Sequence, residues 1–500
     1  MERETGVTKD FLESVLGYKI HRFCLHAGSS LGDNYSCDLF GVDIWLDAGT
    51  SVTLSIIIKC YPTNVARQMI LDSTNSFETE LGVYKQVLPE LYKIQPKEKL
   101  IDLNFPEFIF GQHVPPDKRA SLGRPMMPVD NCIILPDLRQ KGGFRLRDKF
   151  LSFDEPHFSL MVEALAKIHA ISWVYKCKSG VMQLHEKYPF LKKTMSQESL
   201  SEMEGYKNRC YQMAENIVIG SEKALKGLSY LRTVRDFVQN LYYDSTGYEE
   251  QSCTGRTKDT ILKKPRDGTV KDEKPWAVLC HGDAWSNNIL FRYDNENNPI
   301  EVTFVDLQLA RESDPFTDLV YCLYLSTSRE FRMNHLSKML HLYYMKFSAI
   351  CDHFSVPELP GWSWEELNRR FDRARIYGAH MAVYILPIIF KNPEEMQPME
   401  DLERGPTCQQ KEQMSEFLTS LSKAEIVHPV LRERFLGVLE ELVEDGQRLL
   451  QELKNNEKTF LSLRKQVYKA RLGVLEVIIL LKFVGTHSLQ LFSLESKVLN

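Results

Sequence analysis

The sequence predicts an α+β fold in which a sheet-containing N-terminal part precedes a larger, mainly helical part. Short β-rich runs collect before residue 136 and are separated by turn-forming residues. After residue 152, apolar residues recur at spacings of three and four, as they do in amphipathic helices. One hairpin pattern interrupts the helical part at 289–305. We therefore expect an N-terminal lobe at 1–136, a C-terminal lobe at 137–455 and an atypical tail at 456–500.

The composition is that of an ordinary globular protein and argues against several classes of function. The chain has 500 residues and a net charge of −5, which argues against a general binder of nucleic acid or membrane surfaces. No apolar run approaches the ~20 residues of a membrane-spanning helix. The charged start of the chain has no apolar secretory region. Eleven cysteines without CxxC pairs predict reduced thiols and a cytoplasmic location.

The first elements are predicted as a helix, a polar loop and two strands. Apolar spacing predicts a packing helix at 7–20. The next loop contains Gly32 and Asn34, residue types that let the backbone turn tightly and direct N–H groups at an anion. Strand-like runs at 37–45 and 52–59 would make this loop a lid over phosphates. The simpler interpretation is an ordinary turn between strands.

Lys59 ends the apolar run Ile56–Ile58, which is an awkward place for a charge unless an anion pairs with it. Nucleotide phosphates and a glutamate would both serve as partners. The helix predicted at 64–90 carries Glu80, which we take as the glutamate. The alternatives are a lysine that emerges into solvent and a glutamate on a solvated helix face.

A proline-rich stretch at 98–130, flanked by strands at 108–110 and 131–135, leads to a glycine turn that starts with Asp137. We interpret this turn as the hinge between the lobes, with adenine against its backbone. The alternative is a plain linker.

The C-terminal part is predicted as a series of helices. The first begins at Ser152, since Ser152 and Glu155 form a capping-box pattern. His169 lies on its apolar face, and we interpret it as a buried packing residue with no catalytic role. Another helix begins near Asp314 or Thr317. The remaining pattern predicts helices at 196–242, 335–355, 364–390 and 413–455, and loops at 244–275 and 391–412.

The pattern at 289–305 predicts two antiparallel strands joined by the turn-forming segment 294–299. The reversal falls near residue 297, midway between Asn288 and Asp306. These two side chains should therefore lie side by side at the open end of the hairpin. Asp283 lies five residues before Asn288, on the loop that enters the first strand.

Asp283, Asn288 and Asp306 together suit phosphoryl transfer from ATP to a hydroxyl. Mg²⁺ needs hard oxygen ligands, and Asn288 and Asp306 are the candidates. Asp283 is the candidate base that orients the hydroxyl and accepts its proton. The spacing Asp-x₄-Asn is that of the protein-kinase catalytic loop. The simpler interpretation makes each of these residues a turn former.

Two neighbours in this loop are assigned other roles. His281 is expected to brace the loop backbone. Trp285 either lines the acceptor pocket with its flat face or belongs to the core, and the sequence leaves both interpretations open.

The chain resembles the ecdysteroid kinase-like proteins of insects, which belong to the clan of choline kinases and aminoglycoside phosphotransferases. The central motif is His281-Gly282-Asp283-x-Trp285-x-x-Asn288-x-x-Phe291, followed by Asp306-x-Gln308. The resemblance runs from about residue 10 to about residue 450. Other similar motifs occur in the right order: Gly32-Asp33-Asn34-Tyr35, Ile56-Ile57-Ile58-Lys59-x-x-Pro62, Phe77-x-x-Glu80-x-x-x-Tyr84, Asp137-Leu138 and Leu165-Ala166-Lys167-Ile168-His169-Ala170.

The resemblance implies a protein-kinase-like fold, ATP and Mg²⁺ as cofactors, and a small-molecule alcohol as acceptor, such as an ecdysteroid or a xenobiotic-derived alcohol in detoxification. Two residues depart from the family pattern, because Leu307 stands where phenylalanine is usual and Cys37 where serine is common. The sites expected are Gly32, Asn34, Lys59, Glu80 and Asp137 for the nucleotide, Asn288 and Asp306 for the metal, and Asp283 for catalysis.

Two other functions remain open from the sequence. One is a catalytically silent nucleotide-binding protein of the same fold, acting as a scaffold or carrier, although the full set of charged residues argues against it. The other is a metal-dependent phosphoesterase that uses His281 with the same acids. It lacks the second histidine and carboxylate cluster that a two-metal site needs. The apolar and aromatic content of 320–390 favours a hydrophobic alcohol as the acceptor of a kinase.

Overall fold

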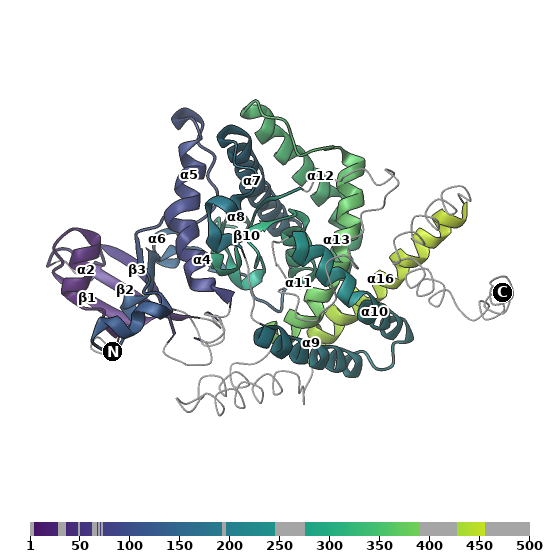
Figure 1. Ribbon diagram of the computed structural model, residues 1–500, viewed down its shortest axis with the longest axis horizontal. Coiled ribbons are helices and arrows are strands. Elements are labelled where there is room, and N and C mark those ends of the chain that lie inside the picture. The colour runs from purple at the N-terminus through teal and green to yellow at the C-terminus, as the bar shows by residue number, and fades with distance from the viewer. Residues whose placement is uncertain are drawn as a thin grey trace.

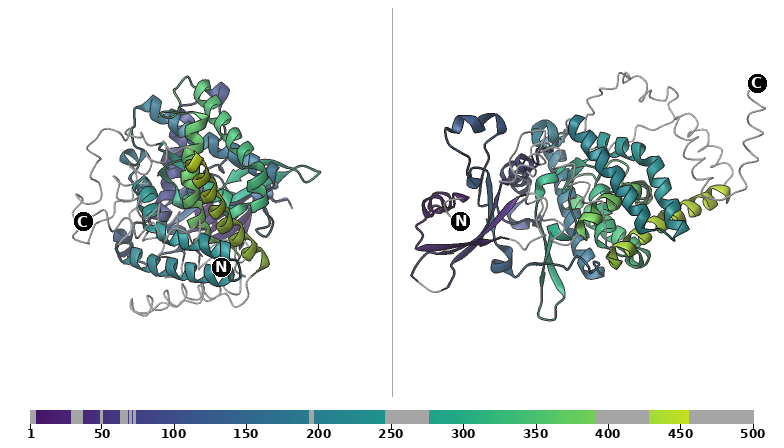
Figure 2. Two further views of the ribbon diagram at one scale, coloured as in Figure 1. Left: turned by 90° about the vertical axis from the view of Figure 1, so that its right-hand side faces the viewer. Right: turned by 90° about the horizontal axis from the view of Figure 1, so that it is seen from below.

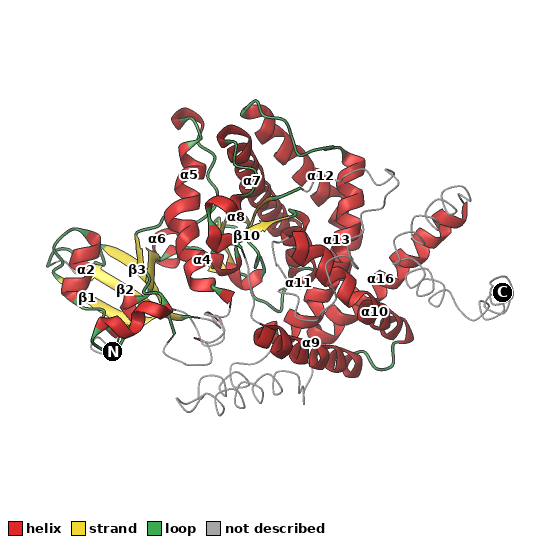
Figure 3. Ribbon diagram, in the orientation of Figure 1, coloured by secondary structure: helices red, strands yellow, loops and turns green. Residues whose placement is uncertain are grey.

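The computed structural model describes residues 5–28, 37–48, 51–62, 68, 71, 74–192, 197–245, 276–390 and 428–455. Within these ranges the strands of the N-terminal part lie at one end of the molecule and the long helices at the other (Figures 1 and 3). The expected loops at 244–275 and 391–412 and the tail at 456–500 lie outside the described residues, except that 244 and 245 end a helix.

The N-terminal part is built on a five-stranded antiparallel sheet. Its strand order is β1-β2-β3-β5-β4, so the third strand lies in the middle. β-branched and aromatic residues fill the strands, as expected for a pleated, half-buried surface. The four strands predicted from the sequence are present with ends shifted by one or two residues: β2 Asp38–Trp45, β3 Leu54–Cys60, β4 Phe110–Gln112 and β5 Cys132–Pro136. The edge strand β1, Arg22–Ala27, was not predicted. The predicted lobe boundary after residue 136 falls at the end of β5.

One face of this sheet is covered by α2 (Lys9–Leu16), which is shorter than the predicted helix at 7–20. The Thr8 side chain accepts a hydrogen bond from the Phe11 N–H and caps the first turn. Leu12 of α2 packs into a buried apolar cluster with residues of β2, β3 and β5. Lys59 lies on β3, whose residues Ile56 and Ile58 belong to this cluster.

The other side of the sheet faces a helical segment with an unusual middle turn. It consists of α4 (Ser76–Gly82), a π-helical turn at Val83–Val87 and α5 (Leu88–Lys93). Predicted residues of this helix at 64–67, 69, 70, 72 and 73 lie outside the described part of the chain. α4 is almost wholly buried and contacts the segment after the catalytic hairpin. Glu80 on α4 therefore lies between the two lobes.

In the C-terminal part α7 runs beside α12 (Figure 1) and contacts the strand β7, while α13 packs against α11 and α16. The core of this part is one large apolar cluster that also includes residues of α4 and α5. The helices are α6 Leu138–Gly142, α7 Glu155–Ser179, α8 Leu184–Lys187, α9 Gln197–Ile217, α10 Glu222–Ser245, α11 Phe316–Ser326, α12 Arg329–His353, α13 Trp364–Ile389 and α16 Pro429–Asn455.

Two small antiparallel sheets lie within the helical part. One pairs β7 (Val278–Cys280) with β10 (Arg311–Ser313). The other has the order β6-β8-β9, formed by Arg145–Leu146, Ile289–Tyr293 and Pro299–Phe304. The hairpin of β8 and β9 projects from the helical part, as Figure 2 shows in its right-hand view. Short 3₁₀ turns complete the chain at 97–99, 116–122, 128–130, 189–191, 286–288 and 307–309.

The capping prediction for α7 was wrong by two residues. Asp154, not Ser152, is the N-cap, and its carboxylate accepts a hydrogen bond from the His157 N–H. Ser152 instead offers its backbone oxygen to Arg147. Glu155 and Pro156 then occupy the first turn, where an acid and a proline are both favoured.

No helix within the described ranges is long and apolar enough to cross a membrane.

Candidate active site

The hairpin brings Asn288 and Asp306 to neighbouring positions, as the sequence predicted. Ile289 pairs with Phe304, and the chain reverses through Asn297, whose positive φ of 64° suits a tight turn. One residue beyond the ladder, the Val305 N–H donates to the Asn288 carbonyl oxygen at 3.0 Å. The polar side chains on either side of this bond therefore face the same end of the hairpin.

Asp283 is held against Asn288 by two hydrogen bonds from one amide group. Asn288 Nδ2 donates to Oδ2 of Asp283 at 2.9 Å and to its backbone oxygen at 3.0 Å. Burial raises the pKa of Asp283 to about 7, and the nearby charge of Asp306 adds to this effect. Hydrogen bonds from Tyr321, Trp285 and Asn288 oppose it. A carboxyl with such a pKa is poised to exchange a proton near neutral pH.

Lys59 lies between two carboxylates and is not exposed to solvent. Its Nζ donates to Oε2 of Glu80 at 2.5 Å and to Oδ1 of Asp306 at 2.6 Å. Lys59 is 6% exposed and Glu80 1% exposed, so the interpretation of a lysine that emerges into solvent is excluded. Burial alone would lower the pKa of Lys59, but Asp306 and Glu80 outweigh it and raise the pKa well above its ordinary value. The ammonium is therefore charged.

Asp306 is in the left-handed backbone region, with φ of 68°. This conformation ends β9 and begins the 3₁₀ turn of Leu307–Leu309. One carboxylate oxygen accepts from Lys59, and the other accepts from Gln308 Nε2 at 3.2 Å. The strained turn thus points the carboxylate out of the hairpin toward the N-terminal sheet.

His281 ties the catalytic loop to the hairpin. Its Nε2 donates to the Val305 carbonyl oxygen at 3.0 Å, and its Nδ1 accepts from the Asp283 N–H at 3.2 Å. Burial lowers the pKa of His281, so the ring is neutral and this tautomer satisfies both contacts. The bracing role expected from the sequence agrees with these contacts.

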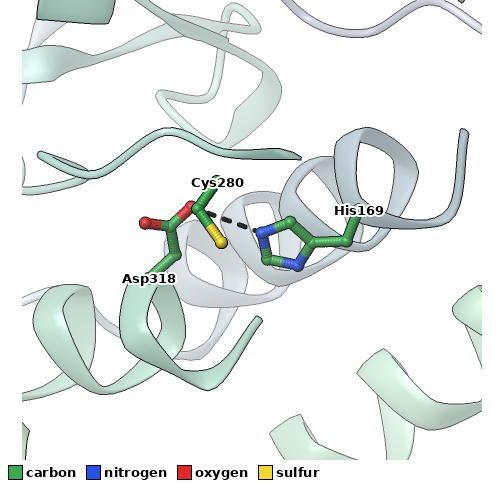
Figure 4. Close-up of side chains that lie close together, drawn as sticks. All are labelled: His169, Cys280 and Asp318. Carbon is green, nitrogen blue, oxygen red and sulfur yellow. Dashed lines mark hydrogen bonds and ion pairs between the residues drawn. The ribbon is translucent and has the colours of Figure 1, made fainter. Parts of the chain in front are cut away.

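A buried carboxylate behind the loop holds its backbone. Asp318 accepts from the N–H groups of His281 at 2.6 Å and Gly282 at 2.8 Å, and His169 Nε2 approaches it at 3.3 Å. Figure 4 shows His169 and Asp318 beside Cys280. Donor atoms of these three residues lie within 4.8 Å of one another, which is close enough to suggest a metal site.

The contacts argue instead for a hydrogen-bonded anchor. N–H groups already occupy the oxygens of Asp318, and burial raises the pKa of the Cys280 thiol well above its ordinary value. The protonated sulfur lies 3.6 Å from the Ser313 carbonyl oxygen, which it can face as a donor. A metal would need a thiolate and free carboxylate oxygens. His169 is fully buried and hydrogen-bonded, as predicted.

The other residues assigned from the sequence either fall outside the described chain or have structural contacts. Gly32 and Asn34 fall in the segment 29–36, outside the described residues. Asp137 follows β5 and caps α6 by accepting from the Arg139 N–H, and it also pairs with the Arg139 side chain. Trp285 is 7% exposed and hydrogen-bonds to Asp283, so it supports the catalytic loop from the core side.

Two functional positions were not assigned from the sequence, Asp318 and Tyr321. The hydroxyl of Tyr321 donates to Oδ1 of Asp283 at 2.6 Å. Both residues lie on α11, which the sequence predicted only as a helix with a cap near its start. An acid twelve residues after Asp306, inside a mostly apolar helix, was the available signal.

The arrangement is that of the protein-kinase-like fold: an antiparallel sheet with a lysine, a helix with a glutamate, and a hairpin that carries three polar side chains. A model of the ecdysteroid kinase-like family matches residues 31–356. This match covers well over half of the chain, and the protein therefore belongs to that family, as its motifs predicted. The predicted α+β fold class is likewise confirmed.

Similar solved structures are small-molecule kinases by their titles. A choline kinase from Streptococcus pneumoniae is 10% identical, with a TM-score of 0.33, over 83% of this chain and 96% of that chain. A choline/ethanolamine kinase family protein from Mesorhizobium loti is 11% identical, with a TM-score of 0.34, over 83% and 92%. An ethanolamine kinase from Plasmodium vivax is 11% identical, with a TM-score of 0.33, over 80% and 82%. A search of curated proteins finds no match.

Proposed function

We propose that the protein is an ATP- and Mg²⁺-dependent phosphotransferase that acts on a hydroxyl of a small molecule. The observation that carries the proposal is the cluster of Glu80, Lys59 and Asp306, whose charge acts on the nearby Asp283. It joins a buried lysine–glutamate pair to a carboxyl with a raised pKa. Family membership supports the same reaction class.

The donor atoms fit a hard divalent cation. Asn288 uses its amide nitrogen for Asp283, and no described residue donates to its amide oxygen. Asp306 adds a carboxylate that is partly exposed, with 18% of its side chain accessible. Oxygen ligands of this kind suit Mg²⁺, which when bound neutralises charge on the phosphates. Asn288 and Asp306 would hold it.

The nucleotide-binding role falls to the remaining assigned residues. Lys59 carries a positive charge that Glu80 keeps in place, and it would neutralise phosphate oxygens. Gly32 and Asn34 are proposed to contact the phosphates through their loop, and the turn at Asp137 to lie against adenine. Asp283 would orient the acceptor hydroxyl and take its proton, since its pKa of about 7 lies near the operating pH.

For the acceptor we propose a hydrophobic alcohol, an ecdysteroid or a xenobiotic-derived alcohol. The helices at 320–390 are rich in apolar and aromatic residues. Tyr321 and Tyr377 border the catalytic loop, and Tyr377 accepts a hydrogen bond from Arg311. Every described cysteine carries a free thiol, which fits a reducing, ATP-rich compartment such as the cytoplasm.

The test is an acceptor screen with purified protein, labelled ATP and Mg²⁺. Ecdysone, cholesterol, simple alcohols, choline and ethanolamine are offered separately, and phosphorylated products are read by mass spectrometry. Asp283→Asn should lower turnover about 10²–10⁴-fold, the usual contribution of a general base. Asp352→Asn, on the exposed side of α12, is the matched control and should keep the wild-type rate.

Two results would contradict the proposal. Equal turnover by wild type and Asp283→Asn would remove Asp283 as the base. A shift in melting temperature with ATP and Mg²⁺, but no product from any acceptor, would support the silent nucleotide-binding alternative.

A further inference from the structure

Tyr321 and Asp283 form one of the shortest buried hydrogen bonds in the catalytic loop. The phenol donates to Oδ1 of Asp283 at 2.6 Å, while Asn288 donates to Oδ2 at 2.9 Å. Tyr321 is 4% exposed and Asp283 is 8% exposed. Both oxygens of the carboxylate thus have a donor, one from α11 and one from the turn before β8, in addition to the hydrogen bond from Trp285.

The position of Tyr321 on α11 makes this contact part of a larger support. Asp318 lies three residues earlier on the same helix, so both side chains share one face. Asp318 holds the backbone N–H groups of His281 and Gly282. α11 therefore binds the catalytic loop twice, at its backbone through Asp318 and at its reactive side chain through Tyr321.

We infer that Tyr321 is a positioning residue for the reaction, which fixes the orientation of the Asp283 carboxylate before the acceptor hydroxyl arrives. This inference rests on the proposed function. With Oδ2 held by Asn288 and Oδ1 by Tyr321, the plane of the carboxylate cannot rotate. The acceptor hydroxyl then meets an oxygen whose orientation is already fixed. Less orientational freedom is therefore lost on reaching the transition state.

The phenol is suited to this task because it keeps its proton. Burial raises the pKa of Tyr321 well above its ordinary value, and the charge of Asp283 adds to the effect. Tyr321 therefore remains a donor over the working pH range.

The simpler alternative is a buried phenol that needs a partner and stabilises only the fold. Tyr324 offers a matched comparison, since it lies one turn further along α11. Its hydroxyl donates to Oε1 of Glu441 on α16 at 3.2 Å and accepts from Arg375 Nε at 3.1 Å, so its partners are on other helices and not in the loop that carries Asp283. Tyr321→Phe and Tyr324→Phe each remove one buried hydroxyl from the same helix, so they should have similar effects on melting temperature.

The experiment compares wild type, Tyr321→Phe, Tyr324→Phe, Asp283→Asn and the double variant Tyr321→Phe with Asp283→Asn. ADP formation is measured with the best acceptor of the screen and with water as the acceptor. Tyr321→Phe should lower kcat about 10- to 100-fold, the worth of one hydrogen bond to a charged group, with KM for ATP unchanged. Tyr324→Phe should keep kcat within about twofold.

The double variant separates positioning from folding. If Tyr321 acts through Asp283, Tyr321→Phe should change kcat little once Asp283 is already asparagine. The inference is overturned if Tyr321→Phe lowers kcat equally in both backgrounds, or no more than Tyr324→Phe does. These outcomes leave the proposed function intact when Asp283→Asn still loses turnover. If the wild type forms no ADP with any acceptor, including water, the proposed function fails and this inference fails with it.

Discussion

Gly282, between His281 and Asp283, occupies a position that only glycine tolerates. Its φ of +84° lies in the left-handed region. A Cβ atom here would lie 2.0 Å from the Leu309 carbonyl oxygen and 2.5 Å from Arg311 Nη1. The backbone of this loop therefore packs directly on the 3₁₀ turn Leu307–Leu309 that follows Asp306, and any side chain at Gly282 would move Asp283.

Replacing Gly282 by alanine should reduce the free energy of unfolding by about 3 kcal/mol or more, because backbone strain and a clash with main-chain atoms add together. Gly180→Ala, at the end of α7, is the control. That glycine has φ of +73° but no atoms within 4 Å of its Cβ position. It should lose only about 1–2 kcal/mol. Urea unfolding monitored by circular dichroism measures the free energy of unfolding of both variants. Equal losses of stability would show that the structure relaxes enough to relieve the clash at Gly282.

At the level of single residues, the sequence predicted the site residues whose positions depend on local geometry. Asp283, Asn288 and Asp306 follow from the register of one hairpin, and a hairpin is specified by its own turn. Asp318 and Tyr321 were not assigned, because every residue of α11 is buried. A helix without a polar stripe does not reveal which of its side chains face the site.

The α16 element binds the helical part through buried charges. Glu441 accepts from Arg332 Nε at 2.8 Å and from Arg375 Nη2 at 2.6 Å, which joins α16 to α12 and α13. Burial alone would raise the pKa of Glu441, but these two arginines outweigh it and lower the pKa. The packing of three helices is thus fixed by one charged cluster.

Arg434, two turns before Glu441 on α16, is an unbalanced charge. It is 4% exposed, and its Nη1 has no hydrogen-bond partner. No described residue forms an ion pair with it. Burial and repulsion by Arg332 lower the pKa of Arg434 to about 10. Such a charge destabilises the fold in which it is buried.

We expect Arg434→Leu to raise the free energy of unfolding by about 1–3 kcal/mol. Arg332→Leu should instead lower it by about 3–5 kcal/mol, because it leaves Glu441 with fewer partners. Arg432→Leu, on the exposed face of the same helix, should change little. Thermal and chemical denaturation of the three variants provides the comparison. A loss of stability in Arg434→Leu similar to that of Arg332→Leu would contradict the view that the Arg434 charge destabilises the fold.

At the level of elements, the sequence predicted most helices and strands but not their ends. The start of α7 was misplaced because two acceptable caps, Ser152 and Asp154, lie close together. The predicted helix through Glu80 contains a π-helical turn that no local pattern announced. Both errors arise because tertiary packing selects among local alternatives of similar energy.

On the scale of the whole molecule, Lys59 links three parts of the chain. It belongs to the N-terminal sheet, Glu80 to α4 and Asp306 to the hairpin of the helical part. This single ammonium is the point where both lobes meet the proposed nucleotide site. The sequence predicted the pair with Glu80 but not the direct contact with Asp306, since that contact depends on how the lobes are set against each other.

Lys59→Met should abolish the stabilisation of the protein by nucleotide. Wild type with ATP and Mg²⁺ at 100 times Kd should gain about 2.7 kcal/mol. The variant should gain almost nothing, and it should also unfold more easily because Glu80 and Asp306 keep their charges without a partner. Lys93→Met, at an exposed lysine of α5, is the control. Differential scanning fluorimetry with and without nucleotide measures the effect, and an unchanged gain in Lys59→Met would refute the role of this residue.

The π-helical turn at Val83–Val87 has a consequence for comparing this chain with its relatives. A turn closed between residues five apart holds one more residue than an α-helical turn does. Removing that residue would rotate everything beyond it by ~100° relative to Glu80. A relative whose glutamate helix is regular throughout would therefore carry a one-letter gap just after the glutamate, and an alignment drawn without that gap would equate inward-facing positions with outward-facing ones along all of α5.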